Sequence, residues 1–158
     1  MQHRKMAFTF DVHDDPSTLP PQYSKLLDRA KAALAHSYAP YSQYRVGAAV
    51  LLGNGEVLAG GNQENAAYPL CLCAERVVLS AAAAQFPEVH PQALAVVVAQ
   101  GNEPATPCGA CRQVIAEQEM RFSRDIALIL RAANGPAYCF TSVKPLLPLA
   151  FTSEALNT

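Results

Sequence analysis

Two short cysteine-containing stretches carry the residue types that could do chemistry. In the second stretch, PCGACR, the thiols of Cys108 and Cys111 are three residues apart. Positions i and i+3 of a helix share one face, so both thiols can bind one ion. The first stretch, CAER, provides Cys73 and, two residues later, the carboxylate of Glu75. Three thiolates leave one position of a tetrahedral zinc site open, as in catalytic zinc sites. Zinc acidifies a water there, and Glu75 is placed to take its proton, so the spacing predicts a zinc hydrolase.

Both stretches lie where a helix is expected to begin. The partial positive charge of a helix N-terminus lowers the pKa of a thiol and favours the thiolate. Three thiolates on Zn²⁺ leave a net negative charge, which weakens the Lewis acidity of the metal. Arg76 and Arg112 lie beside the predicted ligands. Our hypothesis is that one or both donate hydrogen bonds to the sulfurs and restore that acidity. The alternative is a charge in the first helical turn that faces solvent.

The other cysteines leave an alternative open. Cys71 lies two residues before Cys73 and could replace it as a ligand. Because Cys73 has the carboxylate at the right offset, we assign Cys71 and Cys139 to the core, where free cysteines often pack. A non-catalytic zinc module, in which the metal only stabilises the fold, would need a fourth protein ligand. The candidates lie in no matching motif; they are Cys71, Cys139, His36 and His90.

Composition narrows the classes of partner. The chain has 158 residues, 51% of them hydrophobic and 16% charged, which suits one globular domain. The formal net charge is −1 and basic residues do not cluster, so we expect no nucleic acid polymer as partner. No apolar run reaches membrane-spanning length, and acidic residues interrupt the N-terminal region where a signal peptide would stay hydrophobic. The odd number of cysteines fits a reducing compartment, so we expect a cytoplasmic protein.

The periodicity of apolar residues predicts an α/β domain. Expected strands cover Val46–Leu52 and residues 56–59, 94–99, 126–130 and 138–140, the first two joined by a glycine turn. Expected helices cover residues 22–37, 73–85 and 108–119, with a short helix at 143–147. Residues 1–21 are interpreted as a flexible N-terminal arm with a short edge strand at 7–10, and residues 22–158 as a single domain. Alternating helices and strands predict three layers around a mixed sheet.

Further motifs add a resemblance to a known family. CAER followed by PCGACRQ resembles the signature of the zinc-dependent nucleoside deaminases. Cysteine at the first ligand position, together with YSQYRVGAA at 41–49, NQENAAYPL at 62–70 and LLP at 146–148, is similar to the small homotetrameric cytidine deaminases. The similarity covers residues 22–151. It implies a three-layer α/β/α fold with a mixed five-stranded sheet and a bound Zn²⁺.

The resemblance also implies roles for individual residues. The implied zinc ligands are Cys73, Cys108 and Cys111, and the implied proton shuttle is Glu75. Implied contacts to the nucleoside are the ribose hydroxyls with Asn62 and Glu64, the pyrimidine ring with Tyr44, and the base's carbonyl and amino groups with the backbone of Ala74 and Thr106. Because subunits of the family complete each other's pockets, three residues are expected at a neighbouring site: Ala66, Tyr68 and Phe151.

The implied reaction is hydrolytic deamination of cytidine and 2′-deoxycytidine to uridine and 2′-deoxyuridine, with release of ammonia, for pyrimidine salvage. Ring atom N3 must gain a proton as water adds, and the amino group must gain one before ammonia leaves. One carboxylate, Glu75, can do both by general acid–base catalysis. Buried ribose-binding groups left without partners would penalise a free base, so nucleosides are expected to be preferred over cytosine.

Three departures from the family pattern bear on substrate range. Tyr44 stands where phenylalanine is usual, Arg45 where proline is common, and Gly61 where cysteine is usual. The Tyr44 hydroxyl lies next to the expected pyrimidine and could admit or reject modified cytidines. The alternative function is therefore deamination of a modified cytidine or of a cytosine nucleoside antibiotic such as blasticidin S. The NQEN segment favours cytidine.

Overall fold

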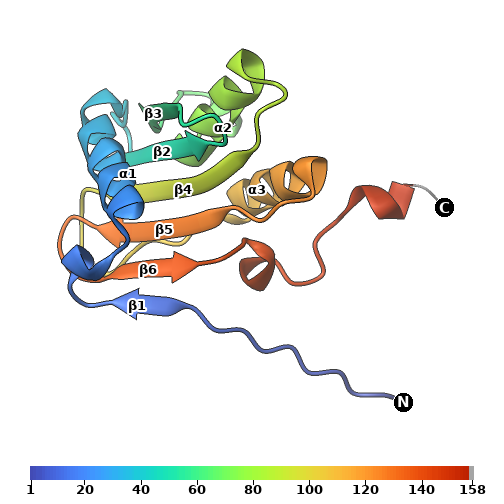
Figure 1. Cartoon of the computed structure of the whole chain (residues 1–158). Coiled ribbons are helices and arrows are strands. Elements are labelled where there is room, and N and C mark those ends of the chain that lie inside the picture. Colours follow the sequence, from blue (N-terminus) through green and yellow to red (C-terminus); the bar gives the residue numbers. More distant parts are fainter. Residues whose placement is uncertain (157–158) are drawn as a thin grey trace.

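A six-stranded mixed sheet forms the middle layer of residues 1–156, the part of the chain that the computed structural model describes (Figure 1). The strand order is β1-β6-β5-β4-β2-β3. In chain order the strands are β1 Asp11–His13, β2 Val46–Leu52, β3 Val57–Gly61, β4 Pro91–Val98, β5 Ala127–Ala132 and β6 Ala137–Phe140. Strands β4 and β5 are parallel, and the other neighbouring strands are antiparallel. The predicted fold class is confirmed.

The sheet has one strand more than the five expected. The predicted edge strand at residues 7–10 was wrong in position, because pairing begins only at Asp11, which lies opposite Cys139 of β6. In this register Phe10 lies opposite Phe140, the last residue of β6, so the residues before Phe10 have passed the end of their partner strand. Phe10 instead stacks on the ring of Phe140, with ring centroids 4.8 Å apart. The domain limit at residue 158 lies outside the described residues.

Helices cover both faces of the sheet. Helix α1, Pro21–Ala32, continues into a 3₁₀ turn at Ala33–His36 and lies on one face; helices α2, Ala74–Gln85, and α3, Gly109–Phe122, lie on the other (Figure 1). The expected helix at 143–147 is a single 3₁₀ turn, Lys144–Leu146. In this part of the chain no helix is both long and apolar enough to cross a membrane.

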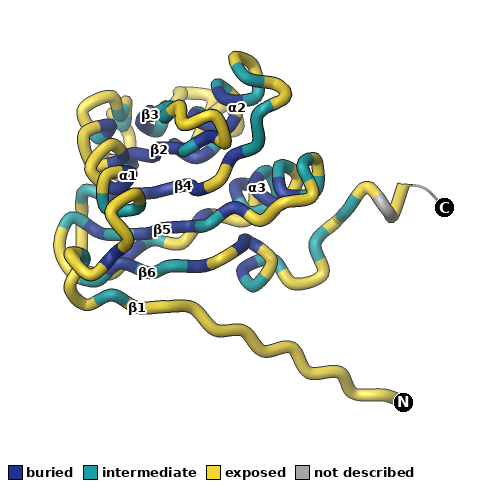
Figure 2. Tube along the Cα trace, viewed as in Figure 1, coloured by how far each residue is buried: buried dark blue, intermediate teal, exposed yellow. Residues whose placement is uncertain are grey.

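Alternation along the strands divides the core between the two faces. On the α1 face, small strand residues such as Ala49 and Ala95 pack with Leu26 and Ala30 of the helix. A Cβ at Gly47 would lie 2.1 Å from the Ala30 carbonyl oxygen, so only glycine allows α1 to approach the sheet this closely. Larger side chains fill the α2 and α3 face; they include Val50, Leu79, Leu94, Ile115 and Leu128. Most of β4 and β5 is buried (Figure 2).

A buried carboxylate fixes the far end of α3. Glu119 is 4% exposed, and its oxygens accept hydrogen bonds from the backbone amides of Ile126 (2.9 Å) and Val143 (3.1 Å). The hydroxyl of Ser142 donates a third bond of 2.9 Å. One side chain therefore joins α3, the start of β5 and the segment after β6. Buried charge is tolerated here because several donors converge on it.

Glu119→Ala removes the acceptor for two buried backbone amides. We expect a loss of about 3 kcal/mol of unfolding free energy, since each unsatisfied buried donor costs about 1–3 kcal/mol. The same substitution at the exposed Glu117 of the same helix is the matched control and is expected to change stability by less than about 0.5 kcal/mol. Urea denaturation of both variants measures the difference, and equal midpoints would contradict this role.

Candidate active site

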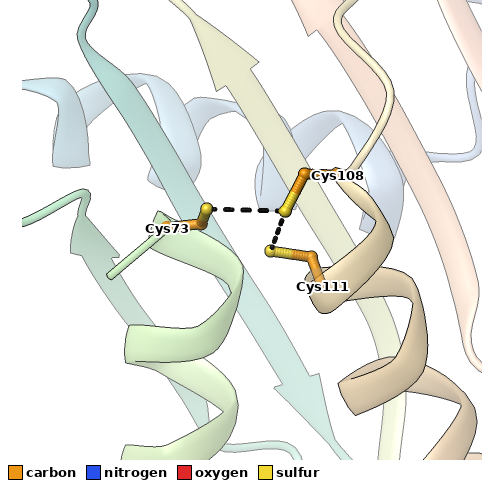
Figure 3. Close-up of side chains that lie close together, drawn as sticks. All are labelled: Cys73, Cys108 and Cys111. Carbon is orange, nitrogen blue, oxygen red and sulfur yellow. Dashed lines mark hydrogen bonds between the residues drawn. The ribbon is translucent and has the colours of Figure 1, made fainter. Parts of the chain in front are cut away.

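The three cysteines of the two motifs meet between the N-terminal ends of α2 and α3 (Figure 3). Cys73 caps α2, Cys108 caps α3, and Cys111 lies one turn into α3. The Cys73 and Cys108 sulfurs are 3.8 Å apart, and those of Cys108 and Cys111 are 3.5 Å apart. Sulfurs bound at about 2.3 Å to one tetrahedral zinc lie about 3.8 Å from one another. The donor set and its spacing therefore fit zinc.

Sulfur ionisation is already biased toward metal binding. The pKa of Cys73 falls to about 6, because the Cys111 and Cys108 thiols donate to its sulfur and the positive charge of Arg76 is close by. The pKa of Cys111 is raised because its thiol is a donor in that same contact and because it is buried. The thiolate, which is the form that binds metals, forms first at Cys73.

Glu75 faces the same space from the first turn of α2. Its side chain is 4% exposed, and burial is the main reason that its pKa is raised above the usual value for glutamate. The nearby Cys73 raises the pKa further. A carboxylate of raised pKa is a stronger base than an exposed one, which suits a group that accepts and returns a proton.

A cavity of about 380 Å³ opens next to the sulfurs. Its volume lies within the range of about 300–1,000 Å³ that is typical of small-molecule sites. Glu75, Cys73 and Cys108 line its metal end. Lining residues from the predicted nucleoside contacts are Tyr44, Asn62, Glu64 and Thr106. The structure therefore places most of the expected site residues around one space.

The side chains of Asn62 and Glu64 are already engaged within the protein. The Asn62 carbonyl accepts from the Ser37 hydroxyl at 2.5 Å and from the Val46 amide at 2.9 Å, and its amide donates to the Tyr44 carbonyl at 2.9 Å. These bonds fix the loop that carries Tyr44 against strand β2. One N–H of the Asn62 amide is left for a ligand.

Glu64 holds the start of the same loop. Its carboxylate accepts from the amides of Tyr41 (2.8 Å) and Ser42 (3.2 Å) and from the Ser42 hydroxyl (2.5 Å). The Ser42 hydroxyl is the main reason that the pKa of Glu64 lies below its usual value. Glu64 is thus ionised at neutral pH and can accept bonds from hydroxyl groups.

Comparison with known proteins assigns the family. The sequence model described as "Cytidine and deoxycytidylate deaminase zinc-binding region" matches residues 20–123, which include both cysteine motifs. The chain belongs to the cytidine and deoxycytidylate deaminase family.

Relatives and solved structures agree with this assignment. The chain is 42% identical over 133 residues to a cytidine deaminase of Halalkalibacterium halodurans, covering 84% of this chain and 96% of that protein. A cytidine deaminase of Sporosarcina psychrophila is 41% identical over 133 residues, 84% of this chain and 93% of its own length. A crystal structure of cytidine deaminase from Burkholderia pseudomallei superposes with a TM-score of 0.72 at 41% identity, covering 80% and 97% of the two chains.

Four further residues expected from the cytidine deaminase pattern do not line the cavity. Ala74 is fully buried in the first turn of α2. Ala66 and Tyr68 are exposed in the loop before α2, and Phe151 is exposed in the C-terminal segment. The Phe151 carbonyl accepts a hydrogen bond of 2.9 Å from Gln113 of α3. None of these three residues lines the cavity of its own chain.

The two arginines beside the predicted zinc ligands contact different groups. Arg76 donates from one guanidinium nitrogen to the Cys71 carbonyl, while its buried Nε has no protein partner among residues 1–156. The positive charge of Arg76 helps to lower the pKa of Cys73. Arg112 donates to the carbonyls of Pro107 and Leu146, each at 2.7 Å.

Arg112 thereby joins the loop just before Cys108 to the C-terminal segment at Leu146. A third bond, 3.1 Å long, reaches the Thr106 hydroxyl, so both residues before Cys108 are held by one guanidinium. These three hydrogen bonds of Arg112 all go to oxygen atoms, so in this structure the side chain positions the loop before Cys108. Donation by either arginine to sulfur in the zinc-bound enzyme stays a prediction.

Sequence reasoning missed several residues that line the deaminase cavity. Ser42 was quoted in a motif without a role, although it ties Glu64 to the loop. Val96 and Val98 of β4 and Leu72 complete the apolar walls. The two valines are separated by two positions and therefore share one face of the strand. Their β-branched type signals a strand, but only the packing of α2 and α3 shows that their face opens into a cavity.

The sulfur geometry predicts how this deaminase binds metal. Replacing Cys108→Ala removes a sulfur that lies 3.8 Å from that of Cys73 and 3.5 Å from that of Cys111. Zinc content is expected to fall from one ion per chain to below about a tenth. Cys139→Ala is the matched control, since Cys139 lies on β6 and is not part of the cluster. Metal analysis of both dialysed proteins measures this, and full zinc retention in Cys108→Ala would contradict the assignment.

Proposed function

We propose that this enzyme hydrolyses cytidine and 2′-deoxycytidine to uridine and 2′-deoxyuridine with release of ammonia, as a step of pyrimidine salvage. The observation that carries the proposal is a cavity of nucleoside size that has three zinc-type sulfurs and a buried glutamate at one end. Hydrogen-bonding groups suited to a ribose, Asn62 and Glu64, line the same cavity.

Zinc held by Cys73, Cys108 and Cys111 would supply a water that is nucleophilic at neutral pH. Glu75, at the metal end of the cavity, accepts the proton that this water loses. It delivers this proton to N3 of the ring as water adds at C4. It then takes the second proton from the hydroxyl group now on C4 and delivers it to the amino group, which departs as ammonia. Burial of Glu75 favours this role because few waters compete for the proton.

The other end of the cavity orients the nucleoside. The Glu64 carboxylate accepts from ribose hydroxyls, and the free N–H of Asn62 donates to one of them. Tyr44 is 41% exposed and lines the cavity, so its ring can lie against the pyrimidine. The Thr106 carbonyl is suited to accept from the amino group of the base, and Arg112 holds that residue in place.

A blasticidin-type substrate is the second candidate, and the Tyr44 hydroxyl at the cavity is the feature that favours it. A non-catalytic zinc module is disfavoured, because the metal cluster found within residues 1–156 contains three candidate ligands, one fewer than a closed structural zinc site has. Steady-state turnover of cytidine, 2′-deoxycytidine and blasticidin S, followed by ultraviolet absorbance, ranks these readings. Cytidine is expected to be the best of the three.

We also propose a cytoplasmic homotetramer. Apolar side chains are exposed beside the cavity, including Tyr41 (49%), Tyr68 (68%) and Leu70 (65%). A second cavity of about 320 Å³, lined by Tyr41 and Tyr68, shares Ser42, Glu64 and Cys71 with the first. A neighbouring subunit seated over this region would cover apolar surface and could bring its own Ala66, Tyr68 or Phe151 to the pocket.

Glu75→Gln keeps the size of the side chain and removes its basicity. The rate constant kcat for cytidine is expected to fall by about 10²–10⁴-fold or more, because general acid–base catalysis contributes that much. Zinc content should not change, since Glu75 is not a ligand. A variant that keeps both the wild-type rate and its zinc would refute the proton-transfer role.

Glu64→Ala separates ribose binding from loop positioning. We expect kcat/KM for cytidine to fall by about 10²-fold, since hydrogen bonds to a charged group contribute about 1.5–3 kcal/mol. Ser42→Ala is the matched control, because it removes the loop hydroxyl bond and leaves the carboxylate in place. If both variants lost activity equally, Glu64 would act through the loop alone.

A further inference from the structure

The segment before β1 lies outside the region matched by the deaminase family, which begins at residue 20. Residues 4–14, here named the edge segment, run along the open edge of the sheet and continue away from it (Figure 1). All of them except His13 are exposed (Figure 2). The catalytic site uses none of them, so their pattern needs another explanation.

Apolar residues recur at every second position of the edge segment. In an extended chain this spacing places them on one face. The exposed fractions are 63% for Met6, 55% for Phe8, 40% for Phe10 and 50% for Val12. Val12 lies opposite Tyr138 of β6, and the Phe10 ring contacts the rings of Tyr138 and Phe140. The row of apolar side chains therefore extends the face of the sheet that α3 covers.

Strand β1 leaves its outer edge open. It is the terminal strand in the order of the sheet, and its pairing partner is β6. The backbone N–H and C=O groups on the other edge are unpaired among the described residues, and such an edge is a template for another strand. A free strand edge combined with an exposed apolar row is suited to strand addition.

We propose that the edge segment pairs in antiparallel register with the same segment of a second copy of this chain, centred on Thr9. In this register opposite residues have numbers that add to 18. The apolar row then meets itself, because Met6 lies opposite Val12 and Phe8 opposite Phe10. At both ends Arg4 lies opposite Asp14. The contact is two-fold symmetric, and its two halves are identical.

The register centred on Thr9 is favoured over its neighbours by which charged and apolar residues it places opposite each other. A shift that centres the pair on Phe10 would place Met6 opposite Asp14. A shift that centres it on Phe8 would place Arg4 opposite Val12. On the face that carries the apolar row, each shift would bring a charge against an apolar side chain at both ends, whereas centring on Thr9 joins opposite charges there. In the register centred on Thr9, the two pairs of Arg4 with Asp14 lie at opposite ends of the apolar row, so the like charges of the two pairs are far apart.

The pairing of Arg4 with Asp14 has to be between two chains. Ten residues of extended strand span about 33 Å, so the two side chains of one edge segment cannot meet. Within the described residues neither of them forms an ion pair. Both are therefore available to a second copy.

Disulfide trapping of the zinc-loaded, full-length protein tests the register. Thr9→Cys places the two introduced thiols directly opposite each other, at a Cα separation of about 4.5–5.5 Å that a disulfide can bridge. Ala7→Cys is the matched control, because each introduced thiol would lie opposite Asp11 and about 13 Å from its counterpart. Both variants are made in a Cys139→Ala background, since Cys139 lies opposite Asp11 on β6.

Under mild oxidation, Thr9→Cys is expected to form a covalent dimer on a non-reducing gel at least about tenfold faster than Ala7→Cys. Equal rates, or no dimer from Thr9→Cys, would overturn the proposal. Arg4→Asp and Asp14→Arg, each added to Thr9→Cys, are expected to slow the reaction about threefold to tenfold, since two symmetric pairs become repulsive. The double reversal is expected to restore the rate, and failure to restore it would also count against the proposal.

Turnover of cytidine tests the deaminase function independently of the strand pairing. The edge segment contributes no residue to the cavity, so deaminase activity per chain is expected to be unchanged in the Arg4→Asp and Asp14→Arg variants. Loss of the deaminase function would leave the cross-linking result intact, and loss of cross-linking would leave the deaminase function intact. The two proposals therefore fail separately.

Discussion

The convergence of two helix N-termini is the constraint on which the rest of the structure depends. Each end supplies partial positive charge to the sulfurs, and each is capped by a cysteine in an extended conformation. Sulfurs 3.5 and 3.8 Å apart would repel as thiolates without an ion and the two helix ends to offset their charge. The sheet fixes both helices on one face, with large apolar side chains beneath them, so the spacing of the sulfurs is set by the core.

Much of this arrangement could be predicted from sequence because it depends on patterns of neighbouring residues. Strand β2 was predicted at its observed bounds, since β-branched and apolar residues run up to a glycine turn. The helix starts followed from the proline before Cys108 and from the spacing of the cysteine motifs. The offset from Cys73 to Glu75 favoured Cys73 over Cys71 as a zinc ligand. In the structure the sulfur of Cys73 lies close to those of Cys108 and Cys111, as that choice requires.

The parts that sequence reasoning missed depend on long-range packing. Glu119 looked like an ordinary residue near the end of a helix, and its role appears only when β5 and the segment after β6 bring three donors to it. The position of Arg112 beside a ligand suggested either a bond to sulfur or a solvent-facing charge, and it did not reveal the three hydrogen bonds to oxygens of Thr106, Pro107 and the distant Leu146. The edge strand was misplaced because its position depends on its register with β6, which lies more than a hundred residues away in the sequence and pairs from Asp11 onward.

The ribose contact proposed for Glu64 has to share that carboxylate with the loop. A carboxylate has about four acceptor positions, and the loop at Tyr41 and Ser42 fills three of them before any nucleoside arrives. A ribose hydroxyl therefore either takes the remaining position or displaces a loop donor. In the second case, entry of the sugar loosens the segment that carries Tyr44, so that the wall against the base is released by the same event that seats the ribose.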